Sequence, residues 1–455
     1  MFWPNGKPCT PINSWLASIA DSTTGRESTK TAASEITPLV RYCHATAGSF
    51  DQFSDNDLYA LYNILLTDVK LSKGIATKAR ETNQIIAIMQ RALSFLIWYQ
   101  NNVRPSSLPP IIGEGRGAQL TVEKKINRRN NSLYYSHAAI PAHAAPSNDK
   151  QPIPVEHITR IQDEVFRISI NEDSKVGRRS NPEHAAYRKA NHAYLYNRRI
   201  FMMWLMEFCG LRPEEMVDMS LEANRDPFNK GIIILPTKKT RELPTPVRQL
   251  PINSDDANEI VSYLEERDAF VHYLITQGRI NTDSGSMFLS EKGLRISKQS
   301  LARDFKRVAE RAGLTDVKIC LSMYRHLFIT RQMIYHIQSE INSATNSSKD
   351  KVATDRMFFS LRDNQAFMLK ICRKITPLTG HKKPSSVEAY FNDAVKILSR
   401  FAESHGDVKN INDMHSSMNS LVRIRHQALL ANNHEIVHEI DAIKHKWSML
   451  RSAHN

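Results

Sequence analysis

Apolar residues recur at helical spacing through the first hundred positions of the chain. In segment 54–69, the spacing predicts a helix whose buried face carries Leu58, Leu61, Leu65 and Val69. Ser54 followed by Asp57 is typical of the N-cap that starts such a helix. Segment 82–102 predicts a second helix with Ile85, Met89, Ala92 and Leu96 on one face. Segment 31–45 predicts a further helix, interrupted near Pro38.

Proline then divides the chain into segments of different character. The stretches "RPSSLPP" and "AAIPAHAAPSNDKQPIP" are typical of a linker, so we expect a helical domain over 1–104 and a linker over 105–155. Between these stretches, basic residues lie beside two tyrosines. This basic segment is either a solvated loop or a strap that contacts a DNA backbone. Its cations are Lys124, Lys125, Arg128 and Arg129.

From residue 156 the pattern indicates a mixed domain that extends to about residue 402. A buried helix ends at Gly210, and two short strands with a basic turn follow within 230–252. Segment 297–314 predicts an amphipathic helix that directs Leu301, Phe305 and Val308 inward. The extension 403–455 carries one apolar stripe, formed by Ile436, Ile440, Ile443, Trp447 and Leu450. The fold class expected is therefore mainly α with a small β-sheet.

Charge narrows the range of partners. The 455 residues carry a formal net charge of +14, which favours a polyanion: nucleic acid first, an anionic membrane surface second. The longest apolar stretch, 200–211, is too short to span a bilayer and contains Glu207. The N-terminus lacks the pattern of a signal peptide. The five scattered cysteines predict reduced thiols in a cytosolic protein rather than disulfides or a zinc site.

Four short motifs contain candidate catalytic residues. In "CGLRPEE", a glycine helix stop and Pro213 enclose Arg212 at a tight corner, where its guanidinium either pairs with a nearby carboxylate or grips two phosphate oxygens. "LSMYRH" places Arg325 at a helix start. "TKKT" is a turn bearing lysines. "TGHKKPSSVEAY" puts Tyr390 nine residues after His381, in the second turn of a helix that the Ser385–Glu388 capping pattern starts near residue 386.

Taken in order, these motifs resemble the tyrosine recombinase, or phage integrase, family over roughly residues 35–401. The resemblance implies a helical, SAM-like core-binding domain over 1–104 and a catalytic domain over 156–402. Together the two domains would form a C-shaped clamp on DNA.

The resemblance also implies a role for each candidate residue. Tyr390 would be the nucleophile that forms a 3′-phosphotyrosine, and Arg212, Arg325 and His381 would stabilise the phosphate charge. Lys239 would protonate the leaving 5′-oxygen, with Lys238 as the close alternative. Lys238, Arg241 and the basic segment of the linker would contact DNA. No metal, ATP or other cofactor is implied.

Two features depart from the family's pattern. The family usually has a histidine three residues before its second arginine, and here that position is Ser322, a poor base. His326 is either a substitute for it or structural. Arg325 and His381 are also widely spaced, because segment 338–356 reads as an inserted polar loop that is passive, a DNA contact or a partner site.

The leading hypothesis is a site-specific DNA recombinase that integrates or excises a mobile element. It would act on double-stranded DNA as a homo-tetramer, with or without accessory proteins, in the cytoplasm at the nucleoid. A type IB topoisomerase-like relaxase and a catalytically dead DNA-binding derivative are the alternatives. The C-terminal stripe would either dock on a neighbouring protomer or pack on its own domain.

Overall fold

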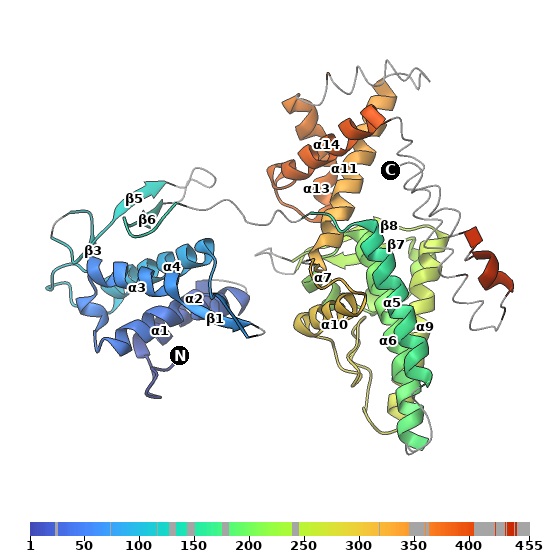
Figure 1. Ribbon diagram of the computed structural model, residues 1–455, viewed down its shortest axis with the longest axis horizontal. Coiled ribbons are helices and arrows are strands. Elements are labelled where there is room, and N and C mark those ends of the chain that lie inside the picture. Colours follow the sequence, from blue (N-terminus) through green and yellow to red (C-terminus); the bar gives the residue numbers. More distant parts are fainter. Residues whose placement is uncertain are drawn as a thin grey trace. The chain divides into compact units, whose positions relative to one another are not determined.

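The chain divides into two compact units, residues 1–149 and 150–455. The computed structural model describes residues 1–22, 26–72, 74–115, 117–126, 133–142, 151–174, 182–238, 245–317, 319–344, 360, 364–404, 424, 433, 435–440 and 442–443. Helices dominate both units, and the sheets are small two-stranded pairs, so the mainly α fold class is confirmed (Figure 1). Among the described residues, no helix combines the length and the hydropathy that a membrane span requires.

The described part of the first unit is built on four helices. They are α1 (Thr10–Ser22), α2 (Arg26–Ala45), α3 (Asp55–Thr67) and α4 (Thr82–Asn102), with the 3-10 turn η1 (Phe50–Gln52) between α2 and α3. The predicted Ser54–Asp57 capping box starts α3. Val69 differs from the prediction: α3 ends at Thr67, and Val69 begins the antiparallel hairpin β1 (Val69–Ser72) and β2 (Ile75–Lys78), where its side chain is exposed.

Pro38 does not interrupt α2, contrary to the interruption that the sequence suggests. The helix continues past it to Ala45, with Ile36 and Leu39 fully buried on either side. A proline inside a helix removes one backbone hydrogen bond and strains one turn. Burial of two large aliphatic side chains offsets that cost here.

The linker expected over 105–155 is not all linker. Four short strands lie within it: β3 (Ile112–Gly113) pairs in parallel with β4 (Leu120–Thr121), and β5 (Glu123–Ile126) pairs antiparallel with β6 (Leu133–Ser136). Ile111, Ile112, Leu120, Val122 and Ala139 are buried in the same core as the four helices. The prolines alone predicted a linker. Apolar residues between them pack on the helices and bury part of this segment.

In its described residues, the second unit contains the longest helices and one hairpin. Its helices are α5 (Val155–Ser174), α6 (Pro182–Cys209), α7 (Pro213–Val217), α8 (Pro227–Lys230), α9 (Ser254–Thr276), α10 (Lys298–Arg311), α11 (Ser322–Ala344), α13 (Gln365–Thr379) and α14 (Glu388–Ser404). The 3-10 turns are η2 (Glu222–Asn224) and η3 (Pro384–Ser386). The predicted strands are β7 (Ile232–Pro236) and β8 (Val247–Pro251), paired antiparallel.

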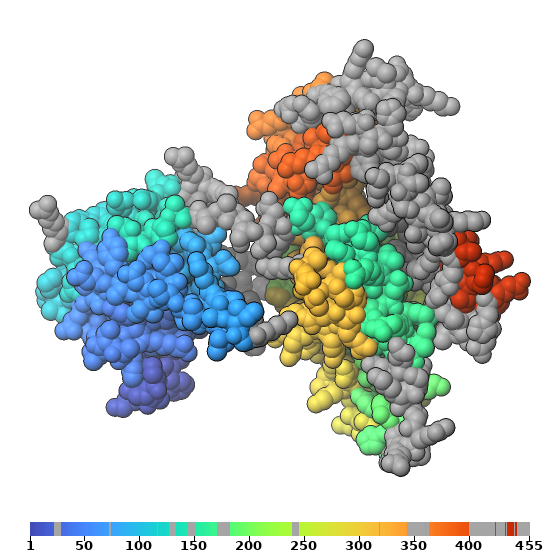
Figure 2. Space-filling model, viewed as in Figure 1, coloured from blue at the N-terminus to red at the C-terminus, as the bar shows by residue number. Residues whose placement is uncertain are grey.

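The described residues of the second unit form two hydrophobic cores. The larger one joins α5, α6, α9 and α10 to the hairpin, and the smaller one joins α11, α13 and α14 (Figure 1). Helix α10 lies beside α5 on the face shown in Figure 2. Buried Asp304 of α10 accepts hydrogen bonds from Arg198 and Arg199 of α6, which ties the two helices together. Leu301, Phe305 and Val308 face inward, as predicted.

Two boundaries in this unit differ from those expected, and the C-terminal stripe is only partly described. Helix α14 begins at Glu388, so Ser385 lies in η3 instead of at the N-cap, and Tyr390 is in the first turn. The first part of the insertion 338–356 continues α11 to Ala344, and the part from 345 on lies outside the described residues. Of the C-terminal stripe, Ile440 is buried, while Trp447 and Leu450 lie outside the described residues.

Gly210 provides a direct test of how the end of α6 is built. Its φ of +57° is left-handed, and a Cβ there would overlap the Phe328 ring of α11. Gly210→Ala should therefore lower the free energy of unfolding by about 2–3 kcal/mol, since backbone strain and overpacking add. Chemical denaturation measures this loss.

The matched control is Gly231→Ala. Gly231 has a similar φ of +59°, but a Cβ there would meet nothing within 4 Å. Gly231→Ala should lower the free energy of unfolding by only about 1 kcal/mol, which is the backbone conformational cost alone. Equal losses in the two variants would contradict the packing argument.

Candidate active site

Arg212 lies where the sequence predicts, at the corner between α6 and α7. Helix α6 ends at Cys209, Gly210 turns the chain, and Arg212 takes the N-cap position of α7. Glu215 accepts hydrogen bonds from the Arg212 backbone nitrogen, at 3.0 Å, and from Arg212 Nη1, at 2.5 Å. The carboxylate pairing that the motif left open is therefore present, and it holds the guanidinium in place.

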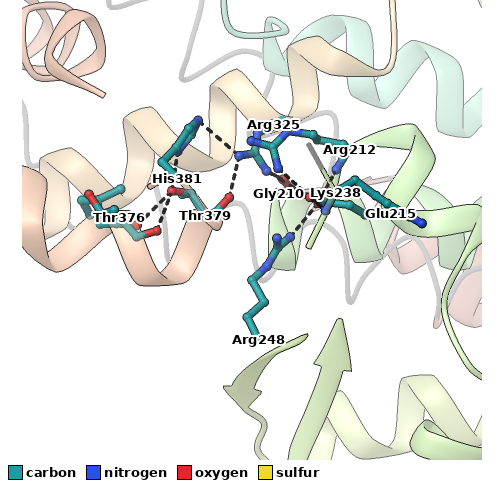
Figure 3. Close-up of polar contacts among 10 residues, drawn as sticks. Gly210, Arg212, Glu215, Lys238, Arg248, Arg325, Thr376, Thr379 and His381 are labelled. Atoms are coloured by element: carbon teal, nitrogen blue, oxygen red, sulfur yellow. Dashed lines mark hydrogen bonds and ion pairs between the residues drawn. The ribbon is translucent and has the colours of Figure 1, made fainter. Parts of the chain in front are cut away.

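The same carboxylate binds a second arginine and approaches a third. Glu215 is fully buried, and its Oε2 accepts from Arg248 Nη2 at 2.9 Å and lies 3.9 Å from Arg325 Nη1 (Figure 3). Burial acts to raise the pKa of the Glu215 carboxyl, but Arg248 and Arg212 outweigh it and hold the pKa below its usual range. Glu215 is therefore ionised at neutral pH.

Backbone carbonyls fix the position of Arg325. Its Nη1 donates to Gly210 O at 2.7 Å and its Nη2 donates to Thr379 O at 2.6 Å (Figure 3). Burial, together with Arg212, lowers the pKa of Arg325 to about 9, which still leaves the guanidinium charged at neutral pH. The three elements α6, α11 and α13 meet at this one side chain.

His381 lies beside Arg325 and is neutral. Burial, Arg325 and Arg212 lower the pKa of His381 to about 3. Its Nε2 is 3.4 Å from Arg325 Nη2, and because a guanidinium only donates, Nε2 is the acceptor in this pair. Nδ1 then carries the proton and donates to Thr379 Oγ1 at 2.7 Å.

Tyr390 contacts the residue that follows Arg325. Its Oη lies 2.6 Å from His326 Nδ1, and the two rings stack with centroids 5.3 Å apart. Burial raises the pKa of the Tyr390 hydroxyl, while Arg325 and Arg212 act in the opposite direction. The tyrosine therefore lies within the electrostatic field of both predicted arginines.

Arg248 is a site residue that the sequence interpretation missed. It lies on β8, on the same inward face as Leu250, and its side chain is buried. A charged residue on the apolar face of an alternating strand was the signal that could have found it. Arg212, Arg248 and Arg325 against Glu215 leave an excess of two positive charges among these four side chains. Such an excess suits a phosphodiester that gains negative charge during reaction.

Other predicted residues lie elsewhere or are already paired. The Ser322 hydroxyl is 3.0 Å from Cys320 Sγ. Lys238 forms an ion pair with Asp218, and its backbone nitrogen donates to Glu215. Lys124 and Lys125 belong to the first unit, on β5, where they pair with Glu114 and Glu123. The predicted cations outside the described residues are Lys239, Arg241, Arg128 and Arg129.

A family comparison covers the segment that contains the three arginines and Glu215. Residues 183–336 match the phage integrase family. The chain contains a phage integrase domain, the domain of tyrosine recombinases. Members of this family generally cleave and rejoin DNA. The matched segment of the integrase domain holds Arg212, Glu215, Arg248 and Arg325, whereas His381 and Tyr390 lie beyond it.

Solved recombinase structures share weak overall similarity with the chain. XerH site-specific recombinase bound to palindromic difH substrate, in a post-cleavage complex, has a TM-score of 0.43 and 13% identity, over 86% of this chain and 80% of that one. XerA recombinase has a TM-score of 0.30 and 12% identity, over 88% of this chain and 99% of that one. No curated protein sequence matches the chain.

Glu215→Gln tests whether the carboxylate holds the arginines. The variant leaves three guanidiniums with no counter-charge among the four side chains, so the free energy of unfolding at pH 7 should fall by about 3–5 kcal/mol. The folded-state pKa of Glu215 is depressed, so its contribution is complete above the ordinary carboxyl pKa of 4.5 and is lost as the pH falls through the lower folded value. The difference in free energy of unfolding between the parent and Glu215→Gln should therefore narrow below about pH 4.5.

Glu214→Gln is the control for this experiment. Glu214 is the adjacent residue, and it pairs with Lys298 at the surface. A surface pair of this kind contributes about 0–1 kcal/mol, so this variant should unfold almost as the parent does. Denaturant titrations at pH 7 and pH 4 compare the three proteins. A gap between parent and Glu215→Gln that does not change with pH would contradict the charge argument.

Proposed function

We propose that this protein is a site-specific DNA recombinase that cleaves and rejoins DNA through a 3′-phosphotyrosyl bond at Tyr390. The observation that carries the proposal is the convergence of Arg212 and Arg325, which are far apart in the sequence, on one buried carboxylate, with Tyr390 in the electrostatic field of both arginines. A phage integrase domain over residues 183–336, which contain both arginines, supports the reaction class.

The proposed chemistry uses the excess positive charge of the site. Tyr390 Oη attacks the phosphorus, and the P–O5′ bond breaks to leave a 5′-hydroxyl. Arg212 and Arg325 donate to the equatorial oxygens, whose negative charge grows in the transition state. The phosphotyrosyl ester retains the energy of the broken linkage, so the reverse attack by a 5′-hydroxyl reseals a strand without ATP. His381 supports Arg325 by accepting its hydrogen bond.

A lysine of the β7–β8 turn is the proposed general acid. The leaving 5′-oxygen needs a proton, and Lys239, or Lys238 beside it, would supply one. The pairing of Lys238 with Asp218 supports Lys239 for this task, since a paired ammonium would first have to leave its carboxylate. The proposed substrate is double-stranded DNA, exchanged between two duplexes by a tetramer, in the cytoplasm.

Covalent trapping tests the reaction directly. The parent protein should become attached to nicked fragments of its source DNA under denaturing conditions, while Tyr390→Phe should not. Sequencing the attached DNA identifies the site. Binding without attachment by the parent would contradict the proposal and favour a catalytically dead DNA-binding derivative. Relaxation of plasmids by a monomer, with no preferred site, would favour a topoisomerase-like relaxase.

Arg212→Lys separates charge from geometry. Lysine keeps the positive charge but cannot present two parallel donors to a phosphate. Cleavage of the trapped site should fall by about 10²-fold, whereas the DNA dissociation constant should change only about three-fold or less.

Gel shift and cleavage assays on the same fragment measure both quantities. Arg225→Lys is the control, because Arg225 pairs with Asp268 at the surface. It should cleave at the parent rate. Full cleavage by Arg212→Lys would remove the bidentate role proposed for Arg212.

A further inference from the structure

The nucleophile of the proposed reaction has to lose a proton, and the residue expected to assist does not reach it. Ser322 occupies the position at which the resemblance predicts a histidine, and its hydroxyl lies against Cys320 Sγ. A serine hydroxyl is also too weak a base near neutral pH to take a phenolic proton. Another group must accept the proton of Tyr390.

His326 is placed to accept it. Its Nδ1 is 2.6 Å from Tyr390 Oη, inside the range expected for a general base and its substrate proton. The imidazole stacks on the phenol at an interplanar angle of 24°, so the ring is held in this orientation. The contact crosses from α11 to α14, which pack against each other over a shared core containing Val387 and Phe391.

The other basic groups of the site are committed elsewhere. His381 Nε2 accepts from Arg325, and its Nδ1 faces Thr379. Lys238 pairs with Asp218. The arginines donate only and remain charged. Among the described residues of the site, His326 is thus the group with both a basic nitrogen and hydrogen-bond reach to the phenol.

The surroundings of Tyr390 make assistance necessary. Burial raises the pKa of the phenol, so ionised tyrosine is scarce at neutral pH. The charged groups that act on the phenol are Arg325, Arg212 and Asp393. The two arginines stabilise the phenolate once it forms, but neither can remove the proton.

We propose that His326 is the general base of the strand-cleavage step, an inference that rests on the proposed function. As Tyr390 Oη attacks phosphorus, its proton passes to His326 Nδ1, and the 5′-oxygen leaves with a proton from the turn lysine. In rejoining, the 5′-hydroxyl gives its proton back to the lysine, and the departing Tyr390 oxygen recovers its proton from His326. Each cycle returns both groups to their initial protonation state.

His326→Asn and His326→Ala separate proton transfer from positioning. Asparagine places an acceptor oxygen near the position of Nδ1, so it keeps the hydrogen bond to Tyr390 but cannot take the proton. Both variants should cleave the trapped site about 10²-fold more slowly than the parent, the lower end for a positioned base. Recovery of the parent rate by His326→Asn would overturn the base role and leave His326 as a positioning residue.

A substrate with sulfur at the 5′-bridging position distinguishes base from acid. A thiolate leaves without a proton, so this substrate should restore cleavage in Lys238→Ala or Lys239→Ala, whichever lysine is the acid. It should not restore His326→Asn. Rescue of His326→Asn would overturn the proposal, because it would place His326 on the leaving-group side.

The pH–rate profile gives a third readout. The parent rate should rise with pH and level off once the imidazole is neutral, whereas His326→Asn should keep rising because only free tyrosinate reacts. If the two profiles have the same shape, the proposal fails.

Nitrogen NMR of labelled histidine tests the inference without DNA. In the parent protein near neutral pH, His326 Nδ1 should give the shift of an unprotonated, hydrogen-bonded nitrogen, and Tyr390→Phe should change it. A protonated Nδ1 in the neutral ring would make His326 a donor and overturn the proposal. Absence of any covalent attachment in the parent would instead contradict the proposed function, so the two failures are distinguishable.

Discussion

The ion pairs of Glu215 are the interaction on which the candidate site depends. One fully buried carboxylate binds Arg212 and Arg248 and lies 3.9 Å from Arg325. Three guanidiniums in a poorly hydrated space repel one another strongly unless an anion lies between them. With the anion in place, their geometry is set before any phosphate arrives, and the cluster still carries an excess of positive charge. Preorganised charge of this kind needs little rearrangement during a reaction.

Backbone carbonyls also connect the arginines to the helices around them. Arg325 donates to Gly210 O at the end of α6 and to Thr379 O at the end of α13. The larger core contains α6 and the smaller core contains α13, so the site forms only where the two cores of the second unit meet. A change of packing in either core would therefore move the carbonyl groups that hold Arg325. Gly210 contributes twice, since its carbonyl binds Arg325 while its lack of a side chain leaves room for Phe328.

The nucleophile and its neighbour come from the smaller core. Tyr390 on α14 contacts His326 on α11, and the two helices pack against each other. His326 directly follows Arg325 in the chain. The segment that matches the integrase family ends at residue 336, so similarity alone does not reach Tyr390. The packing of α14 on α11 joins the tyrosine to the arginines. The matched segment and the packing of α14 on α11 thus meet at one site.

Local sequence determined much of the fold. Ser54 and Asp57 start α3, and Gly210 and Pro213 form the corner at Arg212. Alternating residues form β7 and β8. All three features depend on neighbours within a few residues, which is why the sequence predicts them. The candidates Arg212, Arg325, His381 and Tyr390 were also named from the sequence. Tertiary structure alone decided the contacts of Glu215 with Arg248 and Arg325, the burial of Arg248 and the pairing of Tyr390 with His326. It also turned part of the expected linker into core. These contacts join residues tens of positions apart, and only the packing of helices and strands determines which side chains meet.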